Sequence, residues 1–377
     1  MSRPGSKDRD QFDVIVIGAG QAGLALGHHL ARRQADFVIL EAGPSIGHSW
    51  RRRWDSLRLF SPAQYDSLPG MPFPAAADTH PGKDAVADYL AMYAAHFDLP
   101  VGLDCPVQHV RRGEAGEFLV TTPDGTLLSR QVVVATGPFQ SPWIPVLAGQ
   151  LDPTVPQLHS AEYRNPSQLP AGGRVLVVGA ANSGLQIAAE LAGTCTVTVA
   201  TGSRPLELPQ RFAGRDLFFW LTRSGFFTVP TESRIARRLR ARGDIIIGTQ
   251  SAALRRQGIG FRPRLTRLDG RVAHFVGEGS MEVDAIVWAT GFQSDYSWLD
   301  VPGVVVDGGV HHRRGVTDVQ GLYFIGLPWQ TSRGSALLGF VGNDAAALSE
   351  HMATDAAAAN SESSDWHELP TQPTATR

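Results

Sequence analysis

Several features that mark particular protein classes are missing from this chain. Its 377 residues hold two cysteines, Cys105 and Cys195, too few and too far apart for a C-x-x-C redox pair, a zinc site or a disulfide framework. The 34 basic and 36 acidic residues leave a formal net charge of -2, without the basic excess of nucleic-acid binders. No apolar run predicts a membrane span or a signal peptide. We therefore expect a cytoplasmic globular protein without nucleic acid, a bound metal or a transmembrane segment.

Lysine is scarce as well, because Lys7 and Lys83 are the only lysines among the 34 basic residues. This leaves few candidates for Schiff-base chemistry. What the chain does contain is ordinary for a globular protein, with 43% hydrophobic and 19% charged residues. At roughly 150 residues per domain, its length indicates two or three domains.

The sequence predicts a folded region between two polar ends. Residues 1–10 are polar, and residues 353–377 are poor in aliphatic side chains and rich in Ala, Ser, Thr and Pro, so both predict disordered tails. Between them, Val- and Ile-rich runs alternate with helical patterns, as in FDVIVI before LALGHHLARR. This alternation predicts an α/β fold with parallel sheets and crossover helices. A run rich in Pro and Gly predicts a domain crossing near residues 153–172.

A strand, a glycine-rich turn and a helix occur twice. The turn reads G-A-G-Q-A-G in residues 12–34 and G-A-A-N-S-G in residues 174–193, and their first glycines are 161 residues apart. That separation is too wide for two halves of one nucleotide fold, so it predicts two dinucleotide-binding (Rossmann-like) domains. A second echo ends two apolar strands in Ala-Thr-Gly, whose small residues let backbone approach a ligand. Its candidate residues are Ala135, Thr136, Gly137, Ala289, Thr290 and Gly291.

The first turn carries the full dinucleotide fingerprint. Gly18 permits a tight turn, Gly20 lets a pyrophosphate reach the backbone, and Gly23 lets the helix pack closely on the strand. The pyrophosphate is expected at the helix N-terminus, beside Gln21 and Ala22. Glu41 ends the next strand, 18 residues after Gly23, where a carboxylate can accept hydrogen bonds from an adenosine ribose.

The second turn has the same spacing, but the strand that follows it ends in different residues. Gly179, Ala181 and Gly184 take the three small positions, with Asn182 and Ser183 between them. Eighteen residues after Gly184 stands Gly202, so the acid is missing. Instead the strand ends near Thr201, Ser203 and Arg204, which can bind a 2′-phosphate that a carboxylate would repel. This favours NADP over NAD, although a neutral strand end also admits NAD and Arg204 can be a solvated loop residue.

Beyond the two turns, the chain resembles the flavin-containing monooxygenase superfamily, in its bacterial branch near the YUCCA-type enzymes and the CzcO-type flavoproteins. The resemblance rests on VIVIGAGQAGLALGHHL, GHSWRRRWDSLRLFSPAQYDSLPG, VVVATGPFQSPWIP, VLVVGAANSGLQIAAEL, IVWATGFQSDYSWL and GLYFIGLPWQTSRGSALLGFVGNDAA. It implies FAD at the first turn and NADPH at the second. It also implies a discontinuous FAD domain, residues 11–152 and 290–352, with the NADP domain, residues 153–289, inserted.

The resemblance also implies an activity. NADPH would reduce FAD, and the reduced flavin would react with molecular oxygen to a flavin hydroperoxide that oxygenates a small organic substrate. Expected partners are this substrate and oxygen, and a homodimer is left open. Two alternatives are also left open: an NADPH oxidase or flavin reductase without oxygen insertion, and a nucleotide-sensing flavoprotein linked to ion transport that turns nothing over.

Some positions depart from the family pattern F-x-G-x-x-x-H-x-x-x-[YFW] and its flavin-side residues. Pro153 and Val155 replace the first two residues of this linker motif, whereas His159 and Tyr163 remain, either as a contact at the domain crossing or as a satisfied linker pair. Phe60 stands where many members have Asn. These departures keep the oxidase alternative open.

The resemblance places further residues near the flavin. Trp50 and Trp54 would cover the ring and exclude water, or else pack in the core. Gln330 and Ser335 precede a helix whose N-terminus would face the flavin's pyrimidine edge.

Two stretches of the sequence each allow two interpretations. Residues 206–248, with an aromatic cluster and an arginine run, can form a lid over an apolar pocket that rests on a membrane surface. Alternatively they form a helix pair docked on the NADP domain with a solvated arginine face, which the helical spacing favours. Arg51, Arg52 and Arg53 contact phosphate or face solvent.

Overall fold

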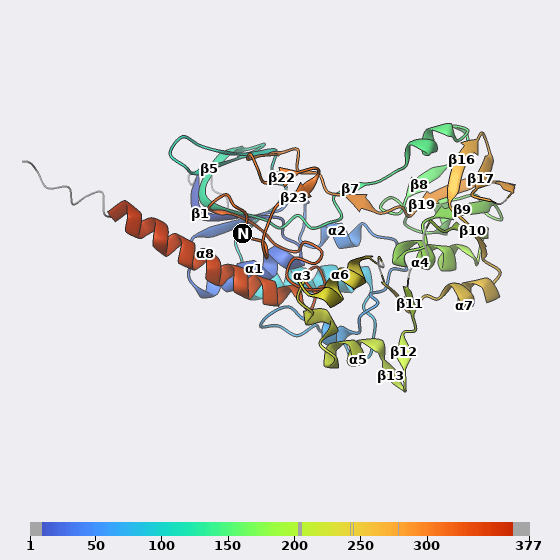
Figure 1. Cartoon of the computed structure of the whole chain (residues 1–377), viewed down its shortest axis with the longest axis horizontal. Coiled ribbons are helices and arrows are strands. Elements are labelled where there is room, and N and C mark those ends of the chain that lie inside the picture. The colour runs from blue at the N-terminus through green and yellow to red at the C-terminus, as the bar shows by residue number, and fades with distance from the viewer. Residues whose placement is uncertain (1–9, 203–205, 242, 244, 278, 365–377) are drawn as a thin grey trace, which may run out of the picture.

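The computed structural model describes residues 10–364, apart from 203–205, 242, 244 and 278 (Figure 1). Its two largest sheets, of eight and five strands, each have helices beside them and form the cores of two lobes (Figure 1). Within the described ranges, no helix combines the length and the apolar character that crossing a membrane requires.

The first sheet has the strand order β21-β4-β5-β6-β1-β2-β3, and β24 pairs with β6. Its central strands are parallel: β1 lies between β2 and β6. Val14 and Val16 of β1 face the helices, whereas Ile15 and Ile17 face a second apolar cluster. Burial on both faces explains the unbroken apolar run. The strands are β1 (Gln11–Ile17), β2 (Phe37–Leu40), β3 (Val101–Gly102), β4 (His109–Arg112), β5 (Phe118–Thr122), β6 (Gly125–Val134), β21 (Leu299–Asp300) and β24 (Leu322–Phe324).

Three long helices cover this sheet: α1 (Gln21–Arg32), α3 (Lys83–His96) and α8 (Val341–Ser364). Helix α8 packs along α1 and then extends beyond the lobe (Figure 1). The prediction of a disordered tail from residue 353 is therefore wrong as far as Ser364. The alanine-rich composition that suggested disorder also favours helix, and α8 continues into it. Residues 1–9 and 365–377 lie outside the described part.

The second sheet is parallel throughout, with the order β15-β10-β9-β19-β8. A three-stranded antiparallel sheet lies beside it in sequence, and the apolar cluster that contains Leu176 and Trp288 joins the two. The elements are β8 (Gln157–His159), β9 (Arg174–Val178), α4 (Asn182–Leu191), β10 (Thr196–Ala200), α7 (Ser251–Arg256), β15 (Gly260–Arg262), β16 (Leu265–Asp269), β17 (Val272–Phe275), β18 (Ser280–Glu282) and β19 (Ala285–Trp288).

The chain crosses between the lobes twice. On the way out it forms β7 (Ser141–Pro142), and on the return β20 (Phe292–Gln293), which pairs antiparallel with β7. After β20 come β21, β22 (Val305–Val306), β23 (Gly309–Val310) and β24, of which β21 and β24 rejoin the first sheet. This connectivity confirms the discontinuous first domain with an inserted second domain. Ala148 of η2 (Val146–Gln150) already packs in the second domain.

Residues 206–248 form an arm that starts in the second lobe and docks on the first. Its core side chains, among them Phe218 and Phe227, pack on Phe60 and Phe340 of the first domain. The favoured prediction of docking on the NADP domain is therefore wrong, although α6 does expose its arginines. The aromatic side chains of the arm pack on apolar side chains of the first domain instead. The arm comprises β11 (Leu206–Leu208), β12 (Arg211–Phe212), β13 (Arg215–Asp216), α5 (Leu217–Arg223), η4 (Phe226–Thr228), α6 (Arg234–Ala241) and β14 (Ile245–Ile247).

Candidate dinucleotide sites

The first glycine-rich turn has the shape that its spacing predicts. Gly18 has φ +109°, and a Cβ there would lie 2.8 Å from the Ala135 carbonyl oxygen. A Cβ on Gly23 would lie 1.9 Å from the Gly18 carbonyl oxygen. Both obstacles are backbone atoms, which a rotamer change cannot relieve, so both positions require glycine.

Gly20 differs from its two neighbours. A Cβ there would meet nothing within 4 Å. Gly20 is also the N-cap of α1, which has no side-chain cap and no acidic residue in its first turn. Open space before free N–H groups and the positive end of the helix dipole fits the pyrophosphate of a dinucleotide.

The two residues after Gly20, Gln21 and Ala22, contact other parts of the first domain. The Gln21 Nε2 donates to the Ala336 carbonyl oxygen over 3.5 Å. Ala22 packs so tightly under Gly326 that a Cβ on Gly326 would lie 2.8 Å from the Ala22 methyl group. Both residues therefore bring the loop after β24 against the start of α1.

Glu41 ends β2 beside the first turn. Its two carboxylate oxygens accept hydrogen bonds from the Ala19 and Gly43 N–H groups, each over 2.9 Å. These donors fix the carboxylate next to the loop, where the fingerprint predicts the ribose of a dinucleotide.

The second turn repeats the first in its close approaches. Gly179 has φ +117°, and a Cβ there would lie 2.2 Å from the Ala289 carbonyl oxygen. A Cβ on Gly184 would lie 2.0 Å from the Gly179 carbonyl oxygen. Ala181 is the N-cap of α4, again without a side-chain cap or an acid in the first turn. The second turn thus fits another pyrophosphate.

Two other predicted residues of this turn lie on α4. The Asn182 side chain bonds the stem of the arm: its Oδ1 accepts from the Ile247 N–H over 3.4 Å, and its Nδ2 donates to the Ile245 carbonyl over 3.5 Å. Ser183 is half-buried in the first helical turn. Asn182 therefore anchors the arm to the second domain.

The two Ala-Thr-Gly motifs occupy equivalent places in the two domains. The Ala135 N–H donates to Ile17 and the Ala289 N–H to Val178, each over 2.8 Å, so each motif lies beside its own glycine-rich turn. The threonines bind the crossing strands: Thr136 accepts from Gln140, and the Thr290 hydroxyl donates to the Trp143 carbonyl. Gly137 and Gly291 have φ +68° and +90° and turn the chain toward the other lobe.

A cavity of about 930 Å³ lies past the ends of β10 and β15. Thr201 and Gly202 line it, as the sequence predicts, whereas Ser203 and Arg204 lie outside the described residues. Three arginines that sequence reasoning missed complete the lining: Arg255, Arg262 and Arg264.

These arginines are held in place by the second domain. The Arg264 Nη2 donates to the Gly202 carbonyl over 3.2 Å, and the Arg255 guanidinium lies 4.3 Å from the Phe261 ring centroid. The Glu207 carboxylate, which also lines the cavity, accepts the Ser251 N–H over 2.9 Å. For Arg262 and Arg264, the signal that the sequence offered is F-R-P-R at the end of an edge strand. The cavity can hold a phosphorylated ribose.

The two tryptophans that the resemblance places near the flavin pack in different surroundings. Trp54 is 5% exposed and packs in the core of the second domain with Tyr163 and Val175, and its Nε1 has no partner among the described residues. Trp50 of α2 (His48–Arg51) is half-buried between the cores of both domains. The core-packing reading therefore applies to Trp54.

Gln330 and Ser335 are both 1% exposed and fold the loop before α8. The Gln330 Oε1 accepts from the Leu327 N–H over 3.3 Å, and the Ser335 Oγ accepts from the Thr331 N–H over 3.0 Å. Asp344 of α8, which sequence reasoning missed, accepts the Thr331 hydroxyl, and burial raises the pKa of Asp344. These bonds set the loop against the start of α8.

His159 and Tyr163 are a satisfied linker pair. The His159 Nδ1 accepts from the Ala161 N–H over 3.1 Å, so its Nε2 carries the proton and donates to the Gly291 carbonyl over 2.9 Å. Burial lowers the pKa of His159. The Tyr163 hydroxyl donates to Glu190 over 2.9 Å. The half-kept motif therefore ties the linker to the second domain through Tyr163 and to the crossing at Gly291 through His159.

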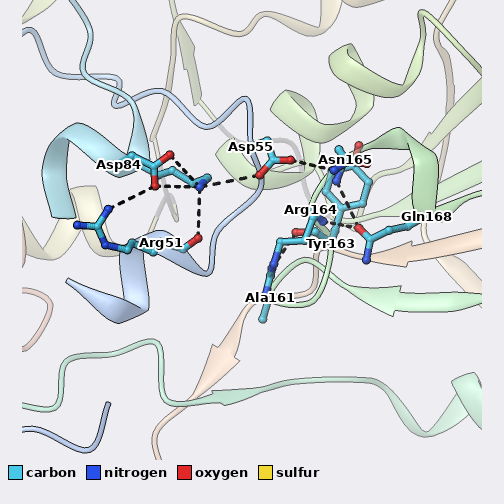
Figure 2. Close-up of polar contacts among 9 residues, drawn as sticks. Arg51, Asp55, Asp84, Ala161, Tyr163, Arg164, Asn165 and Gln168 are labelled. Carbon is cyan, nitrogen blue, oxygen red and sulfur yellow. Dashed lines mark hydrogen bonds and ion pairs between the residues drawn. The ribbon is translucent and has the colours of Figure 1, made fainter. Parts of the chain in front are cut away.

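Figure 2 shows a network of polar contacts between the lobes, which no sequence motif predicted. The Asp55 N–H donates to the Arg164 carbonyl, and the Asn165 Nδ2 donates to the Asp55 carboxylate, each over 2.8 Å. On the other side, Lys83 lies 3.9 Å from the Asp55 carboxylate and 3.0 Å from that of Asp84. Asp55 thus links α3 to the linker of the second domain.

The chain is similar to known oxidoreductases. The family model of the pyridine nucleotide-disulphide oxidoreductases matches residues 15–212. An oxidoreductase of Geobacillus kaustophilus named CzcO-like is 44% identical over 335 residues, which are 88% of this chain and 96% of that protein. CzcO of Bacillus subtilis is 38% identical, over 90% of this chain and 99% of its own.

The chain is also similar to solved structures. A flavin-containing monooxygenase from Stenotrophomonas maltophilia has a TM-score of 0.76 and 31% identity, covering 92% of this chain and 99% of its own. A steroid monooxygenase bound to NADP has a TM-score of 0.66 at 18% identity, covers 93% of this chain and 86% of its own, and shares the fold alone. These findings confirm the expected resemblance and fold class. The chain belongs to the pyridine nucleotide-disulphide oxidoreductase family.

Proposed function

We propose that this protein is an FAD-dependent, NADPH-using monooxygenase that oxygenates a small organic substrate. The observation that carries the proposal is the pair of glycine-rich turns with the same close backbone approaches and the same uncapped helix. One turn per domain suits two dinucleotides that face each other across the junction. The named relatives and neighbours include flavin monooxygenases and favour neither an oxidase nor a sensor.

The chain's residues have distinct tasks in holding these cofactors. Gly20 and the start of α1 bind the FAD pyrophosphate, and Glu41 accepts the ribose hydroxyls. Ala181 and the start of α4 bind the NADPH pyrophosphate. The arginines that line the 930 Å³ cavity bind the 2′-phosphate, and the strand end at Gly202 carries no carboxylate to repel it. When bound, the cofactors supply hydride transfer and oxygen activation, and one oxygen atom goes to the substrate and the other to water.

Other groups order the surroundings of the flavin. We assign the FAD domain to residues 11–152 and 290–352 and the NADP domain to residues 153–289, with η2 packed on the latter. Trp50 and the loop that Gln330 and Ser335 fold lie on the flavin side and exclude water.

Molecular oxygen and the substrate are the proposed partners. A homodimer and a cytoplasmic location stay predictions.

The test starts with the colour of the purified protein, which should be yellow from bound FAD. Anaerobic NADPH should bleach it. Air should then restore the colour, and with a true substrate present the oxygenated product should form in proportion to the NADPH consumed. A colourless protein that stays so with added FAD would overturn the proposal. Bleaching followed only by hydrogen peroxide, with every substrate tried, would replace it with an oxidase.

A further inference from the structure

The arm of residues 206–248 spans both lobes (Figure 1), and its stem, strands β11 and β14, is attached to the second dinucleotide site. Asn182, the first residue of α4, bonds the backbone of β14 at Ile245 and Ile247. Glu207 of β11 lines the 930 Å³ cavity. A dinucleotide with its pyrophosphate at the start of α4 and its ribose in this cavity therefore contacts the residues that hold the stem.

The other end of the arm is attached to the loop before α8. The Thr231 N–H donates to the Thr331 carbonyl over 2.9 Å. The Gly334 N–H donates to the Phe227 carbonyl, also over 2.9 Å. The arm and the loop are thus joined by backbone hydrogen bonds in both directions.

Both ends of this loop, residues 326–336, lie against the first two residues of α1. A Cβ on Gly326 would lie 2.8 Å from the Ala22 methyl group. The Gln21 Nε2 donates to the Ala336 carbonyl over 3.5 Å. Since the start of α1 is the proposed position of the FAD pyrophosphate, the arm and this loop connect the two dinucleotide sites.

Trp329, inside this loop, has a backbone conformation that the arm helps to maintain. Its φ of +59° lies in the left-handed region, which residues with a Cβ rarely adopt. Its carbonyl accepts the Thr231 hydroxyl over 2.8 Å and the Arg240 Nη2 over 3.1 Å. The Arg240 guanidinium also lies 5.2 Å from the centre of the Trp329 ring. Such a conformation persists only where surrounding contacts impose it, and here the arm supplies three of them.

We propose that the arm transmits nucleotide binding at the second site to the flavin at the first, with Thr231 and Arg240 as positioning residues for Trp329. A nucleotide that favours one position of the stem changes the two bonds to the Trp329 carbonyl, and the loop that they hold shifts against the start of α1. This inference rests on the proposed function and adds to it a regulation of the flavin site.

The test uses the yellow holoenzyme and 2′-phospho-ADP-ribose, which is NADP without its nicotinamide ring. This probe has no ring that could stack on the flavin, so any change that it causes in the flavin absorbance or circular dichroism passes through the protein. Calorimetry measures binding in the same samples. We expect the flavin spectrum of the wild type to change saturably over the probe concentrations at which calorimetry detects binding.

Two variants remove the contacts to Trp329 one at a time. Thr231→Val removes the hydroxyl donor, and Arg240→Ala removes the guanidinium. Each should reduce the flavin response at saturation to about half or less, while the Kd of the probe rises by about fivefold at most, because the phosphate contacts remain. Arg238→Ala, the matched control, removes an exposed arginine of the same helix and should change neither quantity. Flavin content should stay normal in all three variants.

The outcomes separate the inference from the proposed function. If Arg240→Ala does not fold, Thr231→Val carries the test, because it leaves the Arg240 contacts in place. A probe that binds the wild type without altering the flavin spectrum would overturn the inference. A full response in the variants would overturn it too, since the signal would then bypass Trp329. A colourless protein, or a wild type that does not bind the probe, would refute the proposed function and the inference with it.

Discussion

The two glycine-rich turns share their backbone geometry and differ in the residue at the end of the next strand. Each has a first glycine with φ above +100°, a last glycine pressed on a carbonyl oxygen, and a helix without a side-chain cap. After the first turn, Glu41 stands at the end of β2, held by two N–H groups. After the second, Gly202 stands in that place, and arginines of α7, of β15 and of the loop after β15 line the same cavity.

This difference separates two physical tasks. The turn binds the pyrophosphate that both cofactors share, and its backbone geometry is the same wherever that group is bound. The end of the second strand decides which adenosine is accepted, since a carboxylate accepts ribose hydroxyls and repels a phosphate. The comparison therefore predicts that the sites can be disabled separately and that their preference can be exchanged.

The largest expected effect comes from filling the pyrophosphate space. Because a Cβ at Gly20 meets no atom within 4 Å, Gly20→Val should fold but yield colourless protein. Ala181→Val, the matching change in the second domain, should leave the protein yellow and raise the KM for NADPH by about a hundredfold or more. Absorbance at purification and steady-state kinetics measure both. A yellow Gly20→Val protein with normal flavin content would contradict the placement of FAD.

Removing the proposed phosphate contact should have a smaller effect. Arg264→Ala should raise the KM for NADPH by about ten- to a hundredfold and leave the KM for NADH nearly unchanged, because NADH lacks the 2′-phosphate. Arg204→Ala should act in the same direction, although Arg204 lies outside the described residues. Arg267→Ala, an exposed arginine of β16, is the control. Equal losses with both nucleotides would rule out a phosphate contact.

Installing the first site's acid in the second would sharpen the comparison. The nearest atom to a Cβ on Gly202 is the Arg264 Nε, at 3.7 Å, so there is room for a side chain. Gly202→Glu should reduce the preference for NADPH over NADH by about tenfold, since the new carboxylate neutralises Arg264 and repels the phosphate. Flavin content should stay normal. An unchanged nucleotide preference would show that position 202 does not lie near the ribose.

The last expected effect leaves both dinucleotide sites untouched and concerns a buried carboxyl group in the first domain. Burial raises the pKa of Asp66 from 3.8 to about 7, and one carboxylate oxygen has no partner among the described residues. Since the folded pKa exceeds the unfolded one, the free energy of unfolding falls as pH rises from about 4 to 7 and then levels off. Asp66→Asn should remove this loss, a gain on the order of 2 kcal/mol at pH 8 relative to pH 5. Thermal unfolding at both pH values measures it, and equal pH dependence in both proteins would contradict the assignment.

Local spacing determined much of this protein. The positions of Gly18, Gly23, Gly179 and Gly184 follow from contacts within one strand–turn–helix unit, so the sequence alone predicts both turns and the two-domain fold. The alanine-rich end of α8 escaped prediction because its composition fits a tail as well as a helix. For Trp54 the sequence left flavin contact and core packing both open, because burial in one domain or the other leaves no local pattern.

Only the tertiary structure decided which distant residues meet. The arginines of the 930 Å³ cavity, the Asp55 junction and the contacts of Arg53 with Phe139 and Phe292 all join segments far apart in the chain. The same holds for the arm of residues 206–248, whose aromatic side chains settled on the first domain. Backbone turns depend on neighbours in sequence, and their residues reveal them. Charge and apolar contacts between domains depend on how the sheets are connected, which a periodic pattern does not encode.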